Sequence, residues 1–287
     1  MKKILNISLI LLLVAALLCA GSPAAFAAGS TTFIMGIDAE YPPFSYMDDS
    51  GDYSGFDVEV CQAVCDKLGW KLEVFPVNWD YKLIQLDAKE CDCVWSGMTI
   101  LDSMKEAGYV LSAPYYDSTQ VIVVKADSGI ASSAELAGKD VAVQLGTSGE
   151  KLLKGDLNEL ANTFNQIILC ESFPKCFTEL DGNGVDAVFV DKPVAEDFVS
   201  KNDGFIVIDE NLGFEQYGIA FRSSDQELCD TIEATVAELV ADGTYAEIAA
   251  NYPDIVNNLL FLNGSEAADE LIASDCVEAA AAVDSAA

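Results

Sequence analysis

The chain has 287 residues, of which 15 are Lys or Arg, 47 are Asp or Glu and none is His, so its formal net charge is −32. Such a charge repels nucleic acid and anionic lipid, and the lack of His removes the usual general base and the commonest metal ligand. These properties exclude a nucleic-acid partner and disfavour an enzyme, while a hydrophobic content of 51% is ample for two modest domains or one large one.

The N-terminal segment has the parts of an export signal. Two lysines precede an apolar run over residues 4–19, and the small-x-small pattern that signal peptidase accepts follows at residues 25–27. We therefore predict a signal peptide over residues 1–27 and an exported protein, in the periplasm or at the outer face of the cell membrane. Lipidation of Cys19 is the alternative, although the bulky Leu18 stands where a lipoprotein signal has a small residue. No later apolar run reaches the roughly 18 residues that span a bilayer.

Strand and helix patterns alternate through the rest of the chain. Apolar and β-branched segments predict strands over residues 32–37, 71–77, 92–96, 120–125, 140–144, 166–169, 187–190 and 217–221. Amphipathic segments predict helices over residues 57–68, 81–88, 133–137, 176–181, 193–200, 225–241 and 245–252, with another opening after residues 146–149. This alternation predicts an α/β fold with mostly parallel sheets flanked by helices. Residues 264–287 are rich in Ala and acidic residues and predict a flexible tail.

Eight cysteines follow the predicted signal peptide: Cys61, Cys65, Cys91, Cys93, Cys170, Cys176, Cys229 and Cys276. An even number of cysteines in an exported chain favours disulfides. The spacing of residues 61–65 and 91–93 is also compatible with zinc held by thiolates, but buried thiols and disulfides are commoner explanations. We predict no metal and no cofactor, and the pairing stays open.

Tyr41 marks a candidate pocket. Residues 40–45 read Glu-Tyr-Pro-Pro-Phe-Ser and connect a predicted strand to an acidic turn and a helix. The ends of strands are where α/β proteins build ligand sites, and the prolines restrict the backbone there. Tyr41 either lines a small-molecule pocket or covers the core, and these residues alone favour neither interpretation.

Several segments follow one another in a fixed order between about residues 32 and 252. They read EYPPFSYMDDSGDYSGFDVEV, VNWD, CDCVWSGMTI, LSAPYYDSTQ, ELAGKDVAVQLGTSGE, GVDAVFVDKPVA, YGIAFRSSDQEL and ADGTYAEI. Together they resemble the bacterial extracellular solute-binding proteins that serve polar amino-acid ABC importers. The resemblance implies a two-lobe periplasmic-binding-protein fold of type II, with two hinge crossovers, that closes on its ligand.

The resemblance also implies lobe boundaries. Lobe 1 is expected over residues 28–117 plus 219–263, and lobe 2 over residues 118–218. The hinges are expected near residues 117–120 and 216–219.

Nine positions match ligand-binding positions of this family, and their roles are implied by the resemblance. Tyr41 and Trp79 match aromatic positions that flank the ligand, and Asp38 matches one that meets a polar ligand side chain. Strand-end groups that hold the ligand's ammonium and carboxylate are matched by Ser96, Gly97 and Thr99.

The three remaining positions belong to lobe 2. Thr147 and Ser148 match a loop where a helix N-terminus offers N–H groups to a carboxylate, which the helix dipole also favours. Asp191 matches the acid that pairs with the α-ammonium, and it follows an apolar strand, where an ionised carboxylate needs a partner. Alternatively Asp191 caps the next helix, since Pro193 suits a first helical turn.

Met104 departs from the family pattern. The family usually carries an Arg there, which grips the α-carboxylate by two hydrogen bonds. Lys105 would point about 100° further round a helix, and Lys is not an equal substitute for Arg. Either Lys105 or helix N–H groups hold the carboxylate, or the ligand lacks one. An amine with an apolar or aromatic body would suit Asp38, Asp191, Tyr41, Trp79 and Met104.

The resemblance implies the substrate-binding component of an ABC importer, which captures an amino acid or related small amine and delivers it to a membrane permease. We expect a non-catalytic monomer. A dehydratase-like enzyme on the same scaffold and a ligand-presenting sensor component are the alternatives. Substrates of the prephenate type carry carboxylates and fit Met104 poorly, and without His only Asp, Glu, Lys or Tyr remain for acid–base chemistry.

Overall fold

The computed structural model describes residues 31–262. The predicted signal peptide with Cys19, the predicted tail at residues 264–287 and Cys276 lie outside the described residues. From Thr32 on, the described chain belongs to one compact unit. Within residues 31–262, no helix is both long enough and apolar enough to cross a membrane.

The first half of the described chain begins with a strand whose bounds are as predicted, β1 (Thr32–Ile37). The elements that follow are β2 (Glu40–Tyr41), β3 (Ser45–Met47), β4 (Tyr53–Ser54), α2 (Phe56–Leu68), β5 (Lys71–Pro76), the 3-10 helix η1 (Trp79–Tyr81), α3 (Lys82–Asp87), β6 (Cys93–Thr99), α4 (Asp102–Glu106), β7 (Val110–Leu111) and β8 (Tyr116–Lys125). Gly69 ends α2 in the left-handed conformation, as its position after the apolar pattern predicts.

The second half continues the alternation of strands and helices. Its elements are η2 (Ser133–Leu136), β9 (Asp140–Gln144), α5 (Ser148–Lys154), α6 (Asn158–Ala161), β10 (Gln166–Cys170), α7 (Phe173–Asp181), β11 (Ala187–Asp191), α8 (Lys192–Lys201), β12 (Phe205–Ile208), β13 (Phe214–Phe221), α9 (Gln226–Asp242), α10 (Thr244–Ala249) and η3 (Val256–Asn258). The long helix α9 carries the apolar face predicted for it, with Ile232, Val236 and Leu239 buried.

A mixed sheet of ten strands runs through the fold in the order β10-β9-β11-β8-β13-β6-β1-β5, with β12 on β8 and β7 on β13. The ladders of β1 with β5 and β6, and of β9 with β10 and β11, are parallel. Every ladder of β8 or β13 among the described residues is antiparallel. The two crossover strands run in opposite directions because the chain leaves lobe 1 on β8 and returns on β13. The parallel arrangement predicted from sequence therefore describes the centre of each lobe.

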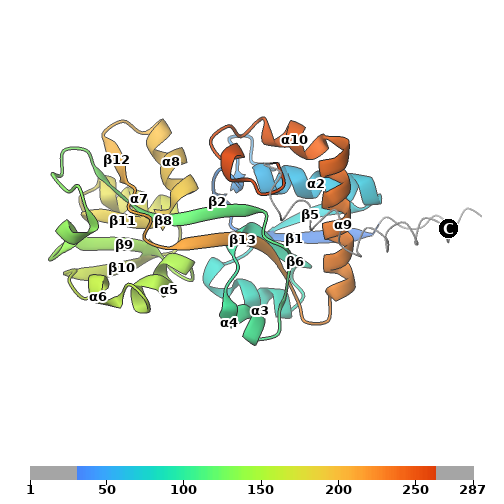
Figure 1. Ribbon diagram of the computed structural model, residues 1–287, viewed down its shortest axis with the longest axis horizontal. Coiled ribbons are helices and arrows are strands. Elements are labelled where there is room, and N and C mark those ends of the chain that lie inside the picture. Colours follow the sequence, from blue (N-terminus) through green and yellow to red (C-terminus); the bar gives the residue numbers. More distant parts are fainter. Residues whose placement is uncertain (1–30, 263–287) are drawn as a thin grey trace, which may run out of the picture. The chain divides into compact units, whose positions relative to one another are not determined.

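The crossover strands lie side by side (Figure 1), with Phe214 opposite Thr119 and Tyr217 opposite Tyr116. The fold is thus a two-lobe α/β fold. Helices α2, α3, α4, α9 and α10 belong to the lobe with β1, β5 and β6, and α5 to α8 belong to the lobe with β9 to β12 (Figure 1). Residues 117–119 and 216–217 of the predicted hinges lie in the paired part of β8 and β13, whereas Gln120 pairs with β11 and Gly218 with β6. The predicted residue bounds of the lobes stay a prediction.

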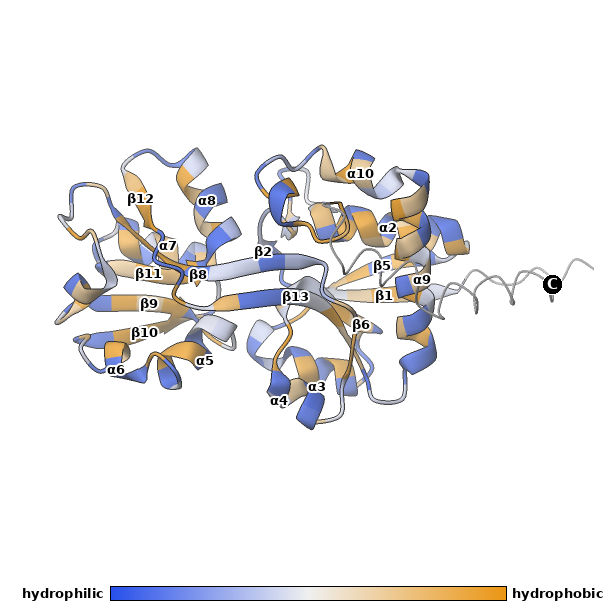
Figure 2. Ribbon diagram, in the orientation of Figure 1, coloured by the Kyte–Doolittle hydropathy of each residue, from blue (hydrophilic) through white to orange (hydrophobic). Residues whose placement is uncertain are grey.

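The strands form the apolar interior. All five residues of β11 are buried, and Val121, Ile122, Val123 and Val124 of β8 are fully buried. Continuous apolar strands of this kind are typical of sheets covered on both faces. Figure 2 shows β11 as mainly hydrophobic, the crossover part of β8 as mainly hydrophilic, and the flanking helices as hydrophobic on part of their surface only.

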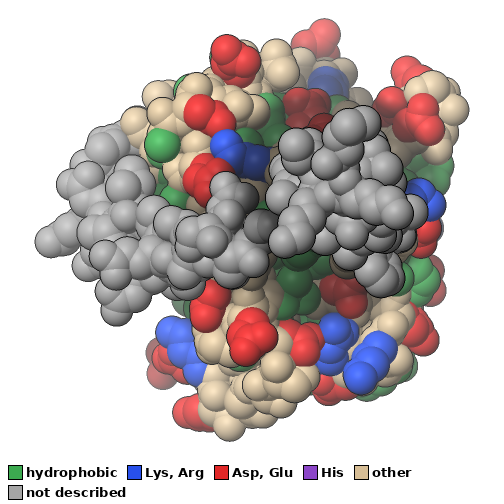
Figure 3. Space-filling model, turned by 90° about the vertical axis from the view of Figure 1, so that its right-hand side faces the viewer, with side chains coloured by type: hydrophobic (Ala, Val, Ile, Leu, Met, Phe, Trp, Pro, Cys, Tyr) green, Lys and Arg blue, Asp and Glu red, His purple; other side chains and the backbone are tan. Residues whose placement is uncertain are grey.

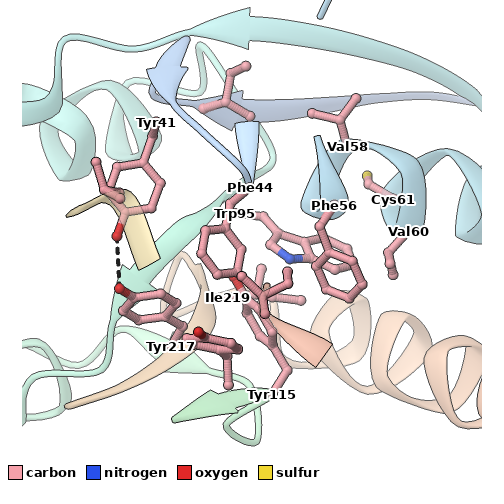
Figure 4. Packing of buried hydrophobic residues seen from close by; sticks show 14 of the residues in the cluster. Tyr41, Phe44, Phe56, Val58, Val60, Cys61, Trp95, Tyr115, Tyr217 and Ile219 are labelled. Carbon is pink, nitrogen blue, oxygen red and sulfur yellow. Dashed lines mark hydrogen bonds between the residues drawn. The ribbon is translucent and has the colours of Figure 1, made fainter. Parts of the chain in front are cut away.

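An aromatic cluster supports the first residues of the candidate pocket. Phe44 packs edge-on against Phe56, Tyr116 and Tyr217. In Figure 4 the hydroxyl of Tyr41 points at that of Tyr217, and the two oxygens lie 2.8 Å apart. Tyr41 belongs to β2, and its hydrogen bond to Tyr217 therefore ties the small sheet β2-β3-β4 to the crossover strand β13.

Candidate functional site

A small cavity of about 20 Å³ lies where the end of β6 approaches the loop between β9 and α5. It has room for about one water molecule, so the lobes must separate to admit a larger ligand. Seven of the nine predicted site residues line it: Tyr41, Trp79, Gly97, Thr99, Thr147, Ser148 and Asp191. Met98, Leu101 and Met104 add an apolar part to the wall. The structure thus brings together most of the predicted residues, from segments far apart in the sequence.

Asp191 ends β11 and is 4% exposed. Its carboxylate accepts hydrogen bonds from the hydroxyl of Tyr41 and from Nε2 of Gln120. Burial raises the pKa of Asp191. Asp191 is the N-cap residue of α8, as the capping alternative expected, but its side chain makes no capping hydrogen bond and lines the cavity.

Asp38 and Ser96 are buried but are not among the residues that line the cavity. Oγ of Ser96 accepts the backbone N–H of Asp38 at 3.0 Å, which ties the end of β1 to β6. The carboxylate of Asp38 accepts Nε2 of Gln144 at 2.7 Å, which links the two lobes. Asp38 and Ser96 therefore support the cavity from the protein interior and do not line it.

Gly97 allows the close approach of Tyr41 to β6. Its φ of +52° lies in the left-handed region, and a Cβ at this position would lie 2.3 Å from Cε1 of Tyr41. The backbone N–H of Gly97 donates to Oδ2 of Asp57 at 2.8 Å. Oδ2 of Asp57 also accepts the hydroxyl of Tyr115 at 2.7 Å, so this turn is anchored from the core side.

The loop before α5 uses its polar groups internally. The hydroxyl of Thr147 accepts the backbone N–H of Glu150 at 3.2 Å and donates to the carbonyl of Gln144 at 2.7 Å. Oε2 of Glu150 accepts the backbone N–H of Gly146 at 2.8 Å. The start of α5 therefore already has an acidic side chain of its own, in the position that the helix dipole favours for an anion.

Glu215 was not predicted; it does not line the cavity, but it binds two residues that do, Thr99 and Ser148. It lies on β13, is 5% exposed, and accepts hydrogen bonds from Oγ of Ser148 at 2.7 Å, Oγ1 of Thr99 at 2.8 Å and Nε2 of Gln120 at 3.0 Å. Burial and the neighbouring Asp191 raise the pKa of Glu215 to about 8. A sequence signal existed, because an acidic residue inside a buried strand requires partners.

Lys82 was also not predicted. Its Nζ donates to the carbonyls of Gly146 at 2.7 Å and Trp79 at 3.0 Å, and lies 4.5 Å from the centroid of the Trp79 ring. Burial lowers the pKa of Lys82 to about 8. Among the described residues that line the cavity it is the only basic one.

The structure distinguishes Met104 from Lys105. Met104 is 4% exposed and lines the cavity. The Lys105 side chain is 59% exposed and pairs with Asp102 at 3.6 Å. Lys105 is not among the residues that line the cavity, so this geometry does not support its contact with a ligand carboxylate.

None of the cysteines within residues 31–262 lines the cavity. All seven cysteines of the described range are buried, and no disulfide joins any of them. Within residues 31–262, no group of three or more His, Cys, Asp and Glu side chains is arranged to hold a metal ion. The zinc alternative for residues 61–65 and 91–93 has no support from this geometry.

Comparison with known proteins relates this geometry to a family. Residues 33–254 match the family model for bacterial extracellular solute-binding proteins, family 3. The L-cystine-binding protein TcyJ of Escherichia coli is 32% identical over 224 residues, which cover 77% of this chain and 82% of that protein.

Solved structures of amino-acid-binding proteins have a similar fold. A substrate-binding protein of an ABC uptake transporter from Streptococcus pneumoniae, with bound histidine, has a TM-score of 0.75 and 25% identity, over 78% of this chain and 94% of the other. The ancestral amino acid-binding protein AncCDT-1, a precursor of cyclohexadienyl dehydratase, has a TM-score of 0.70 and 33% identity, over 77% and 95% of the two chains. The chain therefore belongs to family 3 of the bacterial extracellular solute-binding proteins.

Proposed function

We propose that the protein is the substrate-binding component of an ABC importer, which captures an amino acid or a related small amine between its lobes and delivers it to a membrane permease. Support comes from the family and from relatives that bind L-cystine and histidine. We further propose that it acts as a monomer in the periplasm or at the outer face of the cell membrane.

The cavity between the lobes is the observation that carries the proposal. Tyr41, Trp79 and Thr99 come from one side of the crossover strands, and Ser148 and Asp191 come from the other. A ligand in this cavity would contact both lobes and stabilise their closed arrangement. We assign the ligand's ammonium to Asp191 and its flanks to the two aromatic rings, which suits the preference of cations for carboxylates and aromatic faces.

A dehydratase-like enzyme is the second candidate, because AncCDT-1 is a precursor of such an enzyme. Glu215, with its pKa of about 8, would also retain a proton near neutral pH, as a general acid requires. However, Asp191 lines the cavity, and in its ionised form it would repel a substrate with several carboxylates. The carrier is therefore favoured.

A thermal-shift screen of the purified protein tests the proposal. The probes are the proteinogenic amino acids, polyamines, quaternary amines and aromatic amines, followed by calorimetry and recovery of the ligand. A carrier binds one ligand per chain and returns it unchanged, whereas turnover would identify an enzyme. Light scattering of the same sample reports whether the protein is a monomer. If no amino compound stabilises the protein, the proposed function is wrong.

A further inference from the structure

The hydroxyls of Thr99 and Ser148 point their hydrogens away from the cavity. Oγ1 of Thr99 and Oγ of Ser148 both donate to Oε2 of Glu215, at 2.8 Å and 2.7 Å. A hydroxyl has one hydrogen and two lone pairs, so each of these groups offers only acceptor lone pairs to a ligand. Both residues line the cavity, and both therefore favour a ligand that donates hydrogen bonds.

Other donors around the cavity are also directed at carboxylates of the protein. Nε2 of Gln120 donates to Asp191 and Glu215 and, at 3.3 Å, to Oγ of Ser148, which leaves that hydroxyl one lone pair for a ligand. Nε2 of Gln144 donates to Asp38. These amides therefore stabilise the protein's own acids in place of a ligand carboxylate.

The charges around the cavity favour a cation. Asp191 and Glu215 both accept from one amide nitrogen, so two buried carboxylates lie close together. Buried carboxylates of this kind are stabilised by a positive partner. Lys82 already donates to two backbone carbonyls and lies over Trp79, and no hydrogen bond joins it to Asp191 or Glu215.

We infer that the cavity takes an organic cation without a carboxylate beside its charged group, such as a primary amine with an apolar or aromatic body, and that Glu215 sets this choice by holding Thr99 and Ser148 as acceptors. The apolar wall at Met98, Leu101 and Met104 suits the body of such a ligand. The inference rests on the proposed function, because it names the ligand class of the same site.

The test compares amino acids with the amines that lack only their carboxylate. The pairs are phenylalanine and phenethylamine, histidine and histamine, lysine and cadaverine, and methionine and 3-(methylthio)propylamine, each titrated into the whole protein by calorimetry. In at least one pair the amine is expected to bind about tenfold or more tightly than its parent, because the hydroxyls of Thr99 and Ser148 are directed at Glu215 and do not donate to the parent's carboxylate.

Glu215→Gln tests the role of Glu215. The amide keeps the shape of the side chain, cannot ionise and presents one acceptor oxygen in place of two. One of the two hydroxyls is then able to donate into the cavity, so the preference for the amine is expected to fall by about tenfold. Glu159→Gln, at an exposed position on α6, is the matched control and keeps the preference of the original protein.

The outcomes separate this inference from the proposed function. Parent amino acids that bind as tightly as their amines, or better, overturn the inference and leave the carrier function standing. An unchanged preference in a folded Glu215→Gln variant overturns the assigned role of Glu215. If that variant does not fold, the paired series with the original protein still decides the ligand class. If no member of any pair binds, the inference fails together with the proposed function.

Discussion

Trp79 illustrates how one residue supports the site. Trp79 lines the cavity and is 8% exposed, and the ammonium of Lys82 lies over its ring, 4.5 Å from the centroid. A ligand stacked on this ring would gain contact area and an interaction with the π system. Trp79→Ala is therefore expected to weaken ligand binding by about 1 to 3 kcal/mol, measured by calorimetry.

Trp70→Ala is the control for that prediction. Trp70 packs on Phe33, with ring centroids 5.7 Å apart, and is not among the residues that line the cavity. Its removal should lower stability and leave affinity unchanged. Equal affinities for Trp79→Ala and the original protein would remove Trp79 from the ligand site.

Met104→Arg is expected to raise the affinity for ordinary α-amino acids. A guanidinium at this buried position would offer two parallel hydrogen bonds to a carboxylate. Met104→Leu keeps the apolar wall and serves as the control, since volume-conserving exchanges cost less than about 1.5 kcal/mol. Calorimetry with several amino acids measures the effect. If Met104→Arg binds none of them, the position of Met104 relative to the ligand has been inferred wrongly.

At the residue scale, sequence motifs located Asp191, Thr99 and Ser148 but not Glu215 or Lys82. The motif residues follow strand ends, where side chains converge in α/β folds. Glu215 contacts Thr99 across 116 positions of the chain, and only the pairing of the crossover strands brings it there. Lys82 reaches Gly146 across 64 positions, a contact that depends on how the lobes meet.

The loop between β9 and α5 controls how closely two elements approach. Gly146 has φ +76°, and a Cβ there would lie 2.6 Å from the Cα of Asp80 in η1. Gly146→Ala should therefore hold this loop away from Trp79 and Lys82. We expect ligand affinity to fall by about tenfold or more, because the closed arrangement becomes less populated.

Gly129→Ala controls for backbone strain in this experiment. Gly129 has nearly the same φ, +75°, but a Cβ there would meet nothing within 4 Å. Both variants carry the cost of a left-handed alanine, about 1 to 2 kcal/mol. Affinity from calorimetry and the unfolding temperature are measured for both. An equal loss of affinity would show that strain, and not contact with Asp80, is responsible.

At the element scale, the sequence predicted the longer elements best. The bounds of β1 and β9 agree with the prediction because their buried residues give a clear strand pattern. The strands β2, β4 and β7 have two residues each, too few for any periodicity, and were not predicted. These short strands form only because tertiary contacts hold them, as Tyr41 in β2 is held by Tyr217.

At the scale of the whole molecule, acidic groups dominate. The formal net charge is −32, and on the face drawn in Figure 3 acidic side chains are spread over the visible surface with a few basic ones among them. Burial raises the pKa of Asp38, Asp57, Asp191, Glu215 and Glu233. The folded protein therefore holds protons that the unfolded chain releases.

This difference predicts that stability falls as pH rises. Burial raises the pKa of Asp57 to about 7, and burial with the charge of Asp191 raises that of Glu215 to about 8. Between about pH 4 and these values, the folded state binds more protons than the unfolded state, so the free energy of unfolding decreases with pH. The lowered pKa of Asp242, about 2, acts in the opposite direction but only at lower pH.

Urea unfolding between pH 5 and pH 8 measures this slope. The free energy of unfolding should decrease across the range, and Glu215→Gln should flatten the decrease because a group that binds the proton is removed. Glu159→Gln, at its exposed position, should leave the slope unchanged. A cationic ligand should also flatten it, since a positive charge beside Asp191 and Glu215 favours their ionised forms. Stability that rises from pH 5 to pH 8 would mean that these carboxylates are ionised in the folded protein, with partners that the buried site does not provide.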